Sequence, residues 1–126
     1  MTDNSIRVGR VSSINYEEGT VKVFYSDKDN SVTKDIPYIM NGEYRMPNID
    51  DMVLVLHLSN GSSMGIVVGT FWNGNNKPIE SGKGLYRKEL GIIPGEAFLR
   101  YDSNTKELSI KADTIRLVTE NETTTF

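Results

Sequence analysis

The chain has 126 residues, a mass of 14.1 kDa and a formal net charge of −3. This length suits one domain, or one domain with an appendage. The acidic balance argues against a nucleic-acid binder, whose surface is normally basic. The absence of cysteine excludes disulfides, thiolate metal sites and cysteine nucleophiles. The first residues show no signal peptide and no apolar run approaches the length of a membrane span, so we expect synthesis in the cytoplasm.

The first 78 residues predict five short strands, because β-branched and aromatic residues recur between turn residues. Gly9 predicts a bulge or bend in the first strand. Pro37 ends the third because it has no amide hydrogen to donate to a ladder. The dipeptide Asn60-Gly61 predicts the turn before the fifth strand. The predicted strands cover residues 6–11, 20–25, 32–36, 52–58 and 63–70.

The fourth of these strands, MVLVLHL at 52–58, is apolar at almost every position and does not alternate. A strand of this kind is buried on both faces. One face of a small barrel is its core, so the other face needs a cover, and a neighbouring subunit is the simplest one. We therefore predict Leu54 and Leu56 of this strand near contacts between the barrels of neighbouring subunits, and we place Trp72, after the fifth strand, near the same contacts. A five-stranded Greek-key barrel of OB type fits the strand count, and an SH3-like barrel or a small sandwich fits nearly as well.

The composition changes after the Asn-rich loop 73–78. We predict a barrel over 1–78, a glycine-bearing linker or neck over 79–95, and a β-rich segment over 96–126. That last segment contains β-like runs at 96–101, 106–112 and 114–119, followed by a polar tail expected to be disordered. Three such strands bury too little apolar surface to stand alone. We expect copies of the segment to pack around a symmetry axis through the apolar residues Leu108, Ile110, Ile115 and Leu117.

No arrangement of residues predicts catalysis, a cofactor or a metal. The single histidine, His57, lies in an apolar strand without a second histidine or a paired carboxylate nearby. The acidic pairs Glu17-Glu18 and Asp50-Asp51 both lie at predicted turns, where they are solvated. The aromatic residues of the barrel could form a base-stacking platform, but the acidic balance favours packing. We therefore predict a protein that is not an enzyme.

Several segments together resemble phage baseplate assembly protein V and the related spike proteins of contractile tails and type VI secretion systems. No single motif is specific, but the order and spacing of the segments match over nearly the whole chain. The matching segments are RVGRV at 7–11, GTVKV at 19–23, residues 44–47 and 50–55, GIVVG at 65–69, residues 73–78 and GEAFLRYD at 95–102.

The resemblance implies a homotrimer at the centre of a contractile baseplate, in a phage virion or a bacteriocin-like particle. Its OB barrels would plug the tail tube inside the hub, and its C-terminal strands would form a three-fold β-prism or β-helix that leads penetration of the target envelope. Hub and tube proteins would be its partners, and a separate tip protein is a further candidate. The chain lacks the His-x-His pair of metal-capped spike tips and has no room for a lysozyme-like insertion. The alternative is an OB module that binds single-stranded nucleic acid, with a monomeric or dimeric mass.

Overall fold

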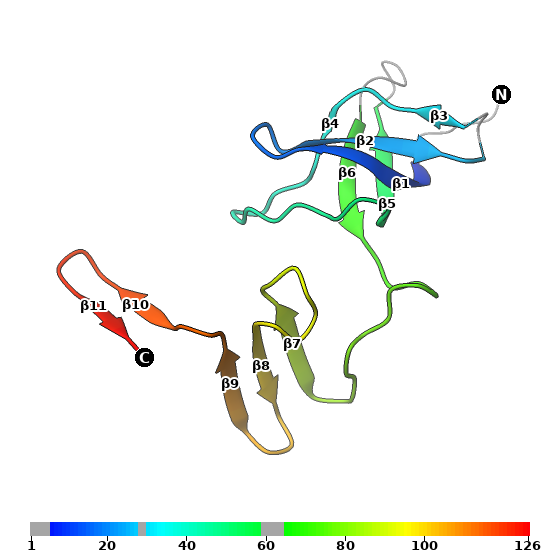
Figure 1. Cartoon of the computed structure of the whole chain (residues 1–126). Coiled ribbons are helices and arrows are strands. Elements are labelled where there is room, and N and C mark those ends of the chain that lie inside the picture. The colour runs from blue at the N-terminus through cyan, green and yellow to red at the C-terminus, as the bar shows by residue number, and fades with distance from the viewer. Residues whose placement is uncertain (1–5, 28–29, 59–64) are drawn as a thin grey trace. The chain divides into compact units, whose positions relative to one another are not determined.

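A computed structural model describes residues 6–27, 30–58 and 65–126, which form strands and turns but no helix (Figure 1). The predicted all-β class is therefore confirmed. The described residues consequently include no helix that is long and apolar enough to cross a membrane. The chain divides into two compact units, Met1–Asn76 and Lys77–Phe126. The predicted turn at Asn60-Gly61 lies outside the described residues.

The first unit is one antiparallel sheet with the strand order β3-β2-β1-β5-β6, and β4 lies beside β2. Its strands are β1 Ile6–Asn15, β2 Thr20–Tyr25, β3 Ser31–Val32, β4 Ile36–Pro37, β5 Met52–His57 and β6 Gly65–Thr70. Two isolated bridges also lie among the described residues of this unit: a parallel one between Tyr38 and Val67 of β6, and an antiparallel one between Asn73 and Asn76. The described part of the sheet is therefore curled, with β6 facing the segment after β4, but it is not a closed barrel.

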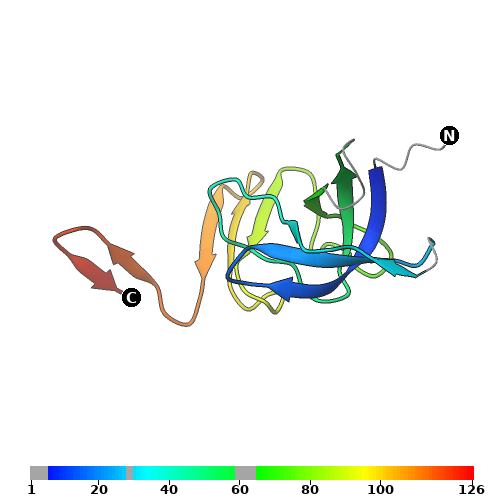
Figure 2. The same ribbon diagram turned by 90° about the horizontal axis from the view of Figure 1, so that it is seen from above.

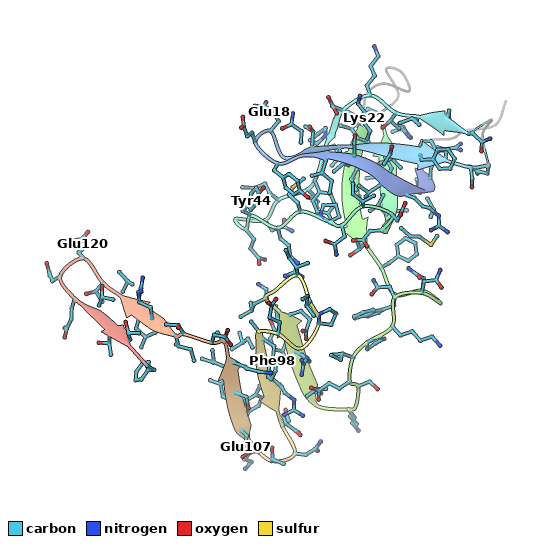
Figure 3. All side chains as sticks on the ribbon, in the orientation of Figure 1. Glu18, Lys22, Tyr44, Phe98, Glu107 and Glu120 are labelled. Atoms are coloured by element: carbon cyan, nitrogen blue, oxygen red, sulfur yellow. The ribbon has the colours of Figure 1, made fainter. Side chains whose placement is uncertain are left out.

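The core of this unit lies on one face of the curled sheet. In β2, Val21, Val23 and Tyr25 are buried while Lys22 between them is exposed (Figure 3), as the alternation of a half-buried strand requires. Most of the buried side chains are valines, whose branched Cβ suits strand backbone. The full set of buried apolar residues is Val11, Val21, Val23, Tyr25, Ile36, Val53, Val55 and Val67.

Position 9 requires a residue without a Cβ, because the side chains and backbone of β2 lie close to β1 there. A Cβ at this position would lie 2.4 Å from Cγ1 of Val23, 2.7 Å from Cδ1 of Tyr25 and 2.8 Å from the carbonyl oxygen of Phe24. The bend predicted at Gly9 does not occur at that residue. β1 continues through Gly9, and its register with β2 shifts later, between Val11 and Ser13. The glycine serves close packing of two strands.

The predicted third strand, 32–36, is divided into two short strands. β3 ends at Val32 and β4 begins at Ile36. Between them the side-chain hydroxyl of Thr33 accepts the hydrogen bond of the Val23 amide at 2.9 Å. The Thr33 amide donates in turn to the Val23 carbonyl at 2.9 Å. Thr33 therefore stays bonded to β2, but its hydroxyl takes the place of its backbone carbonyl. The strand ends at Pro37 itself and not one residue before it. Pro37 is the last residue of β4 and lies opposite Thr20.

The second unit contains two ladders that Figures 1 and 2 show from two directions. A three-stranded antiparallel meander has the order β7-β8-β9, and a two-stranded hairpin follows it. The strands are β7 Leu85–Glu89, β8 Phe98–Asp102, β9 Glu107–Lys111, β10 Arg116–Val118 and β11 Thr123–Thr125. No residue from 77 to 126 is buried, in contrast to the first unit.

Two sequence predictions for this unit are wrong. The range 79–95 is not a linker throughout, because β7 pairs with β8 over five consecutive residues. The tail 120–126 is not structureless, because Thr123–Thr125 pairs with Arg116–Val118 and the Phe126 amide donates to the Ile115 carbonyl at 2.8 Å. Threonine is polar in composition but favours extended backbone. Both segments form strands because a neighbouring strand pairs with them, although neither has a strong hydrophobic period of its own.

Gly9→Ala should destabilise the first unit, because the new methyl group meets Val23, Tyr25 and the backbone of Phe24. Overpacking of this kind costs about 1–3 kcal/mol. Urea unfolding of Gly9→Ala should show that loss in the free energy of unfolding. Gly74→Ala is the matched control, since a Cβ at Gly74 meets no atom within 4 Å. Equal stability of the two variants would contradict the close packing described at Gly9.

Candidate subunit interface

Strand alternation divides the β7-β8-β9 sheet into two chemically different faces. Register places Tyr86 beside Tyr101 and Tyr101 beside Leu108 on one face. On the opposite face Arg87 lies beside Arg100, and Arg100 beside Ser109. Successive residues of a strand point to opposite sides, so each face keeps its character across all three strands. We call them the apolar face and the ionic face. The apolar face comprises Tyr86, Lys88, Leu99, Tyr101, Leu108 and Ile110; the ionic face comprises Leu85, Arg87, Glu89, Phe98, Arg100, Asp102, Glu107, Ser109 and Lys111.

The apolar face is exposed in the single chain. Leu108 is 63% exposed and Ile110 is 53% exposed, and the rings of Tyr86 and Tyr101 are also open to solvent. Both predicted packing residues of β9 therefore lie on this face, next to Leu99 and Tyr101 of β8. Exposed apolar surface of this kind is typical of interaction sites, which makes this face a candidate interface.

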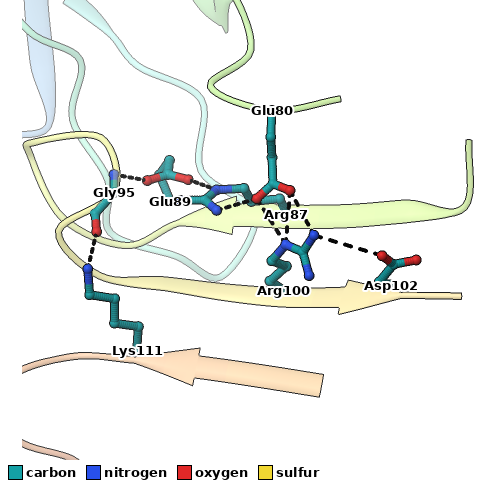
Figure 4. A network of polar contacts seen from close by, with 7 residues as sticks. All are labelled: Glu80, Arg87, Glu89, Gly95, Arg100, Asp102 and Lys111. Carbon is teal, nitrogen blue, oxygen red and sulfur yellow. Dashed lines mark hydrogen bonds and ion pairs between the residues drawn. The ribbon is translucent and has the colours of Figure 1, made fainter. Parts of the chain in front are cut away.

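The ionic face is satisfied within the chain by an ion-pair network (Figure 4). The Glu80 carboxylate accepts hydrogen bonds from Arg87 and from Arg100, whose Nε lies 2.9 Å from Oε2. Arg87 also donates to Glu89, and its guanidinium lies 3.9 Å from the centre of the Phe98 ring (Phe98 is labelled in Figure 3). Asp102 lies 3.9 Å from Arg100. These contacts keep two neighbouring arginines together despite their like charge.

Glu80 connects the segment before β7 to this sheet. Hydrogen bonds from Arg100 and Arg87 hold the pKa of the Glu80 carboxyl below its ordinary value. The pKa of each of the two arginines is raised in turn, by hydrogen bonds to Glu89 and Glu80 for Arg87 and to Glu80 for Arg100. The ionic face therefore has its own covering chain segment, while the apolar face has none within the unit. This asymmetry selects the apolar face as the candidate interface.

The other two predicted packing residues of this unit lie outside the three-stranded sheet. Leu117 belongs to β10 and is exposed, while Ile115 precedes β10 and is partly buried. The hairpin that contains them pairs only with itself among the described residues. The structure thus brings Leu108 and Ile110 together but leaves Ile115 and Leu117 on a separate ladder. Their predicted role in packing remains a prediction.

In the first unit, Leu54 and Leu56 both lie on the outer side of β5, opposite the buried Val53 and Val55. Register aligns Leu56 with Ile6 on β1 and with Ile66 on β6, which forms an apolar row across three strands. Leu56 is 39% exposed. Leu54 lines a shallow pocket of about 310 Å³ together with Val8, Val68, Gly69, Thr70 and Phe71. Within the chain β5 is therefore fully buried on one face only.

Trp72 lies two residues after β6 and is 67% exposed. It is not among the residues that line the pocket beside Leu54. Trp72 lines a second shallow pocket with Thr70, Phe71 and Asn76, and Thr70 and Phe71 also line the pocket beside Leu54. The indole ring is therefore largely exposed next to that pocket, as a subunit contact would require.

His57 has a structural partner within the first unit. The Tyr25 hydroxyl and His57 Nε2 are 2.7 Å apart, and the two rings meet edge to face. The Arg7 guanidinium lies over the Tyr25 ring at 4.4 Å and pairs with Asp27 at 2.9 Å. Burial raises the pKa of Tyr25 to about 12. Within the described ranges no three metal-ligating side chains gather. The contacts of His57 are with Tyr25, which belongs to the buried core.

The sequence reasoning missed one of the three strands of the candidate interface. Tyr86 and Lys88 on β7 were assigned to a linker, so the third strand of the sheet was absent from the prediction. The only local signal is the weak alternation in LYRKE, where apolar and charged residues mix on both faces. The ion pairs from Glu80 could not be foreseen, because Glu80 and Arg100 are 20 residues apart.

Comparison with known families and proteins does not add a relative: no protein-family model matches the chain, and no curated protein matches it.

Glu80→Gln should loosen the second unit at neutral pH, because a neutral amide cannot neutralise both arginines. The lowered pKa of Glu80 means that its contribution is present above the ordinary glutamate pKa of about 4.3 and is lost as pH falls through the folded-state value. The melting temperatures of wild type and Glu80→Gln should therefore differ at pH 7 and converge in acid. Glu107→Gln, on the exposed end of β9, is the control and should change little. A constant difference at all pH values would contradict the ion-pair explanation.

Proposed function

We propose that this chain is the central spike subunit of a contractile phage tail or of a related phage-tail-like particle. It acts as a homotrimer whose first unit plugs the tail tube at the baseplate hub and whose second unit leads envelope penetration. Its role is mechanical and needs no bond chemistry from the chain. Hub and tube proteins are its neighbours in the particle, and a separate tip protein is a candidate for the end of the spike.

One observation carries this proposal: the second unit has 50 residues from Lys77 to Phe126, regular β-pairing, and no buried side chain. A unit of that kind gains little from the hydrophobic effect as a single chain. It becomes stable when copies cover its apolar face. A bundle of sheets held by backbone ladders resists bending along its length, which is what a penetrating spike requires.

The arrangement of the first unit supports the OB-type assignment. In an OB barrel five strands form a partly open Greek-key barrel. Here β1 pairs with both β2 and β5, and the segment after β4 reaches β6 through the Tyr38–Val67 bridge. That connection brings the two edges of the sheet together in the order that such a barrel needs. The outer apolar row through Leu56 then supplies a second contact surface for neighbours.

The mass of the purified protein in solution tests the proposal. Light scattering coupled to size exclusion should give three times the 14.1 kDa of the single chain. A clean monomer would contradict the spike assignment. A monomer that also bound single-stranded DNA with a strong salt dependence would support the alternative OB module.

Substitutions on the two faces of β9 test which face the copies share. Leu108→Asp places a charge on the apolar face and should shift the trimer to monomer at micromolar concentration, because burying an unpaired charge is strongly unfavourable. Ser109→Asp is the matched control on the adjacent residue, where the new carboxylate faces Arg100. That variant should keep the trimer mass. Dissociation by Ser109→Asp but not by Leu108→Asp would assign the interface to the ionic face.

A further inference from the structure

The loop between β7 and β8 presents apolar side chains outward on a polar base. Ile92 is 81% exposed and Ile93 is 63% exposed, and Leu90 beside them is also open to solvent. Connecting loops normally carry polar residues at their tips. Residues 90–94, Leu-Gly-Ile-Ile-Pro, contain no charged or hydrogen-bonding side chain. We call this segment the apolar tip.

Hydrogen bonds below the apolar tip hold it in one conformation. The Gly95 amide donates to Oε1 of Glu89 at 2.7 Å, and the Glu96 amide donates to the Ile93 carbonyl at 3.0 Å. Lys111 of β9 donates from Nζ to the Gly95 carbonyl at 3.0 Å. The charged groups next to the tip are thus directed to its backbone, which leaves only apolar groups on its outer surface.

Two glycines shape the same loop. Gly95 has φ +87°, a conformation that residues with a Cβ rarely adopt. A Cβ at Gly91 would lie 2.4 Å from the Glu96 carboxylate. Since Glu96 comes close to the loop backbone here, the turn is tight as well as fixed. A fixed apolar tip loses little conformational entropy on binding, which favours a role in recognition.

The apolar tip continues the apolar face of the sheet. The Leu90 amide donates to the Ala97 carbonyl at 2.9 Å, so the β7–β8 pairing extends one row beyond Glu89 and Phe98. Alternation places Leu90 on the side of Tyr86 and Lys88, and Ala97 on the side of Leu99. The apolar face therefore runs from Leu108 and Ile110, through Leu99, to the base of the tip.

We propose that the apolar tips of neighbouring copies of this chain pack against one another and close one end of the shared apolar core. This inference rests on the proposed trimer and adds a contact outside its strands. In a closed symmetric assembly, equivalent loops lie at the same level along the axis. The tip continues the apolar face through the Leu90–Ala97 pairing, so copies that share this face bring their tips together. The absence of charge on residues 90–94 does not suit an anionic membrane or a nucleic acid, both of which attract cationic groups.

Single cysteines test this contact without interference, because the chain has none of its own. Ile92→Cys in the full-length protein should form a covalent dimer under mild oxidation, since packed tips bring equivalent Cα atoms within about 7 Å. Thr105→Cys is the control, placed in the β8–β9 turn at the opposite end of the sheet. It should stay uncrosslinked. Before oxidation, a maleimide should label Ile92→Cys at least about tenfold more slowly than Thr105→Cys.

The outcomes separate this inference from the proposed function. A trimer in which Ile92→Cys neither crosslinks nor is protected from maleimide overturns the tip contact and leaves the spike assignment standing. A monomeric wild type overturns both. If Ile92→Cys disturbs assembly, the double variant Ile92→Ser/Ile93→Ser provides the second measurement. It should lower the melting temperature of the trimer, and an unchanged melting temperature would contradict packing of the tips.

Discussion

The pairing of Arg87 and Arg100 with Glu80 stabilises one face of the sheet in the second unit. Like charges directly opposite each other on neighbouring strands are destabilising, and here β7 and β8 align two guanidinium groups. The carboxylate of Glu80 lies between them and accepts hydrogen bonds from both. The chain itself therefore supplies both the hydrogen-bond acceptor and the negative charge that this face requires. The opposite face has no such cover, and its tyrosines and aliphatic residues remain exposed.

The two units therefore differ in how far their apolar side chains are covered. The first unit curls its sheet so that valines from four strands meet in one core. The second unit keeps an open three-stranded meander, whose apolar side chains stay exposed in the single chain. The apolar tip shows the same contrast. Hydrogen bonds within the chain satisfy its polar base, while its apolar surface stays exposed.

Sequence reasoning succeeded where the period of the residues was strong. TVKVFY predicted a half-buried strand, and the structure has β2 at the predicted residues with Val21 and Val23 inside. It failed where a single distant contact decided the outcome. The predicted third strand is divided between Val32 and Ile36, where Thr33 accepts the Val23 amide through its hydroxyl and not through its carbonyl. LYRKE became a strand because β8 offered a partner, and the threonines of the tail because β10 did. No local pattern reports these pairings.

The sequence by itself determined the all-β class, the positions of the strong strands, and the change in character after the Asn-rich loop. These follow from properties of neighbouring residues: β-branched side chains, alternation, and turn-forming Asn, Gly and Pro. Only the tertiary structure decided which face of each strand is covered. That choice depends on register between distant segments, as when Glu80 reaches Arg100 or Leu90 aligns with Ala97. Shifting a strand by one residue would exchange its two faces, so composition cannot reveal which side of the sheet in the second unit stays exposed.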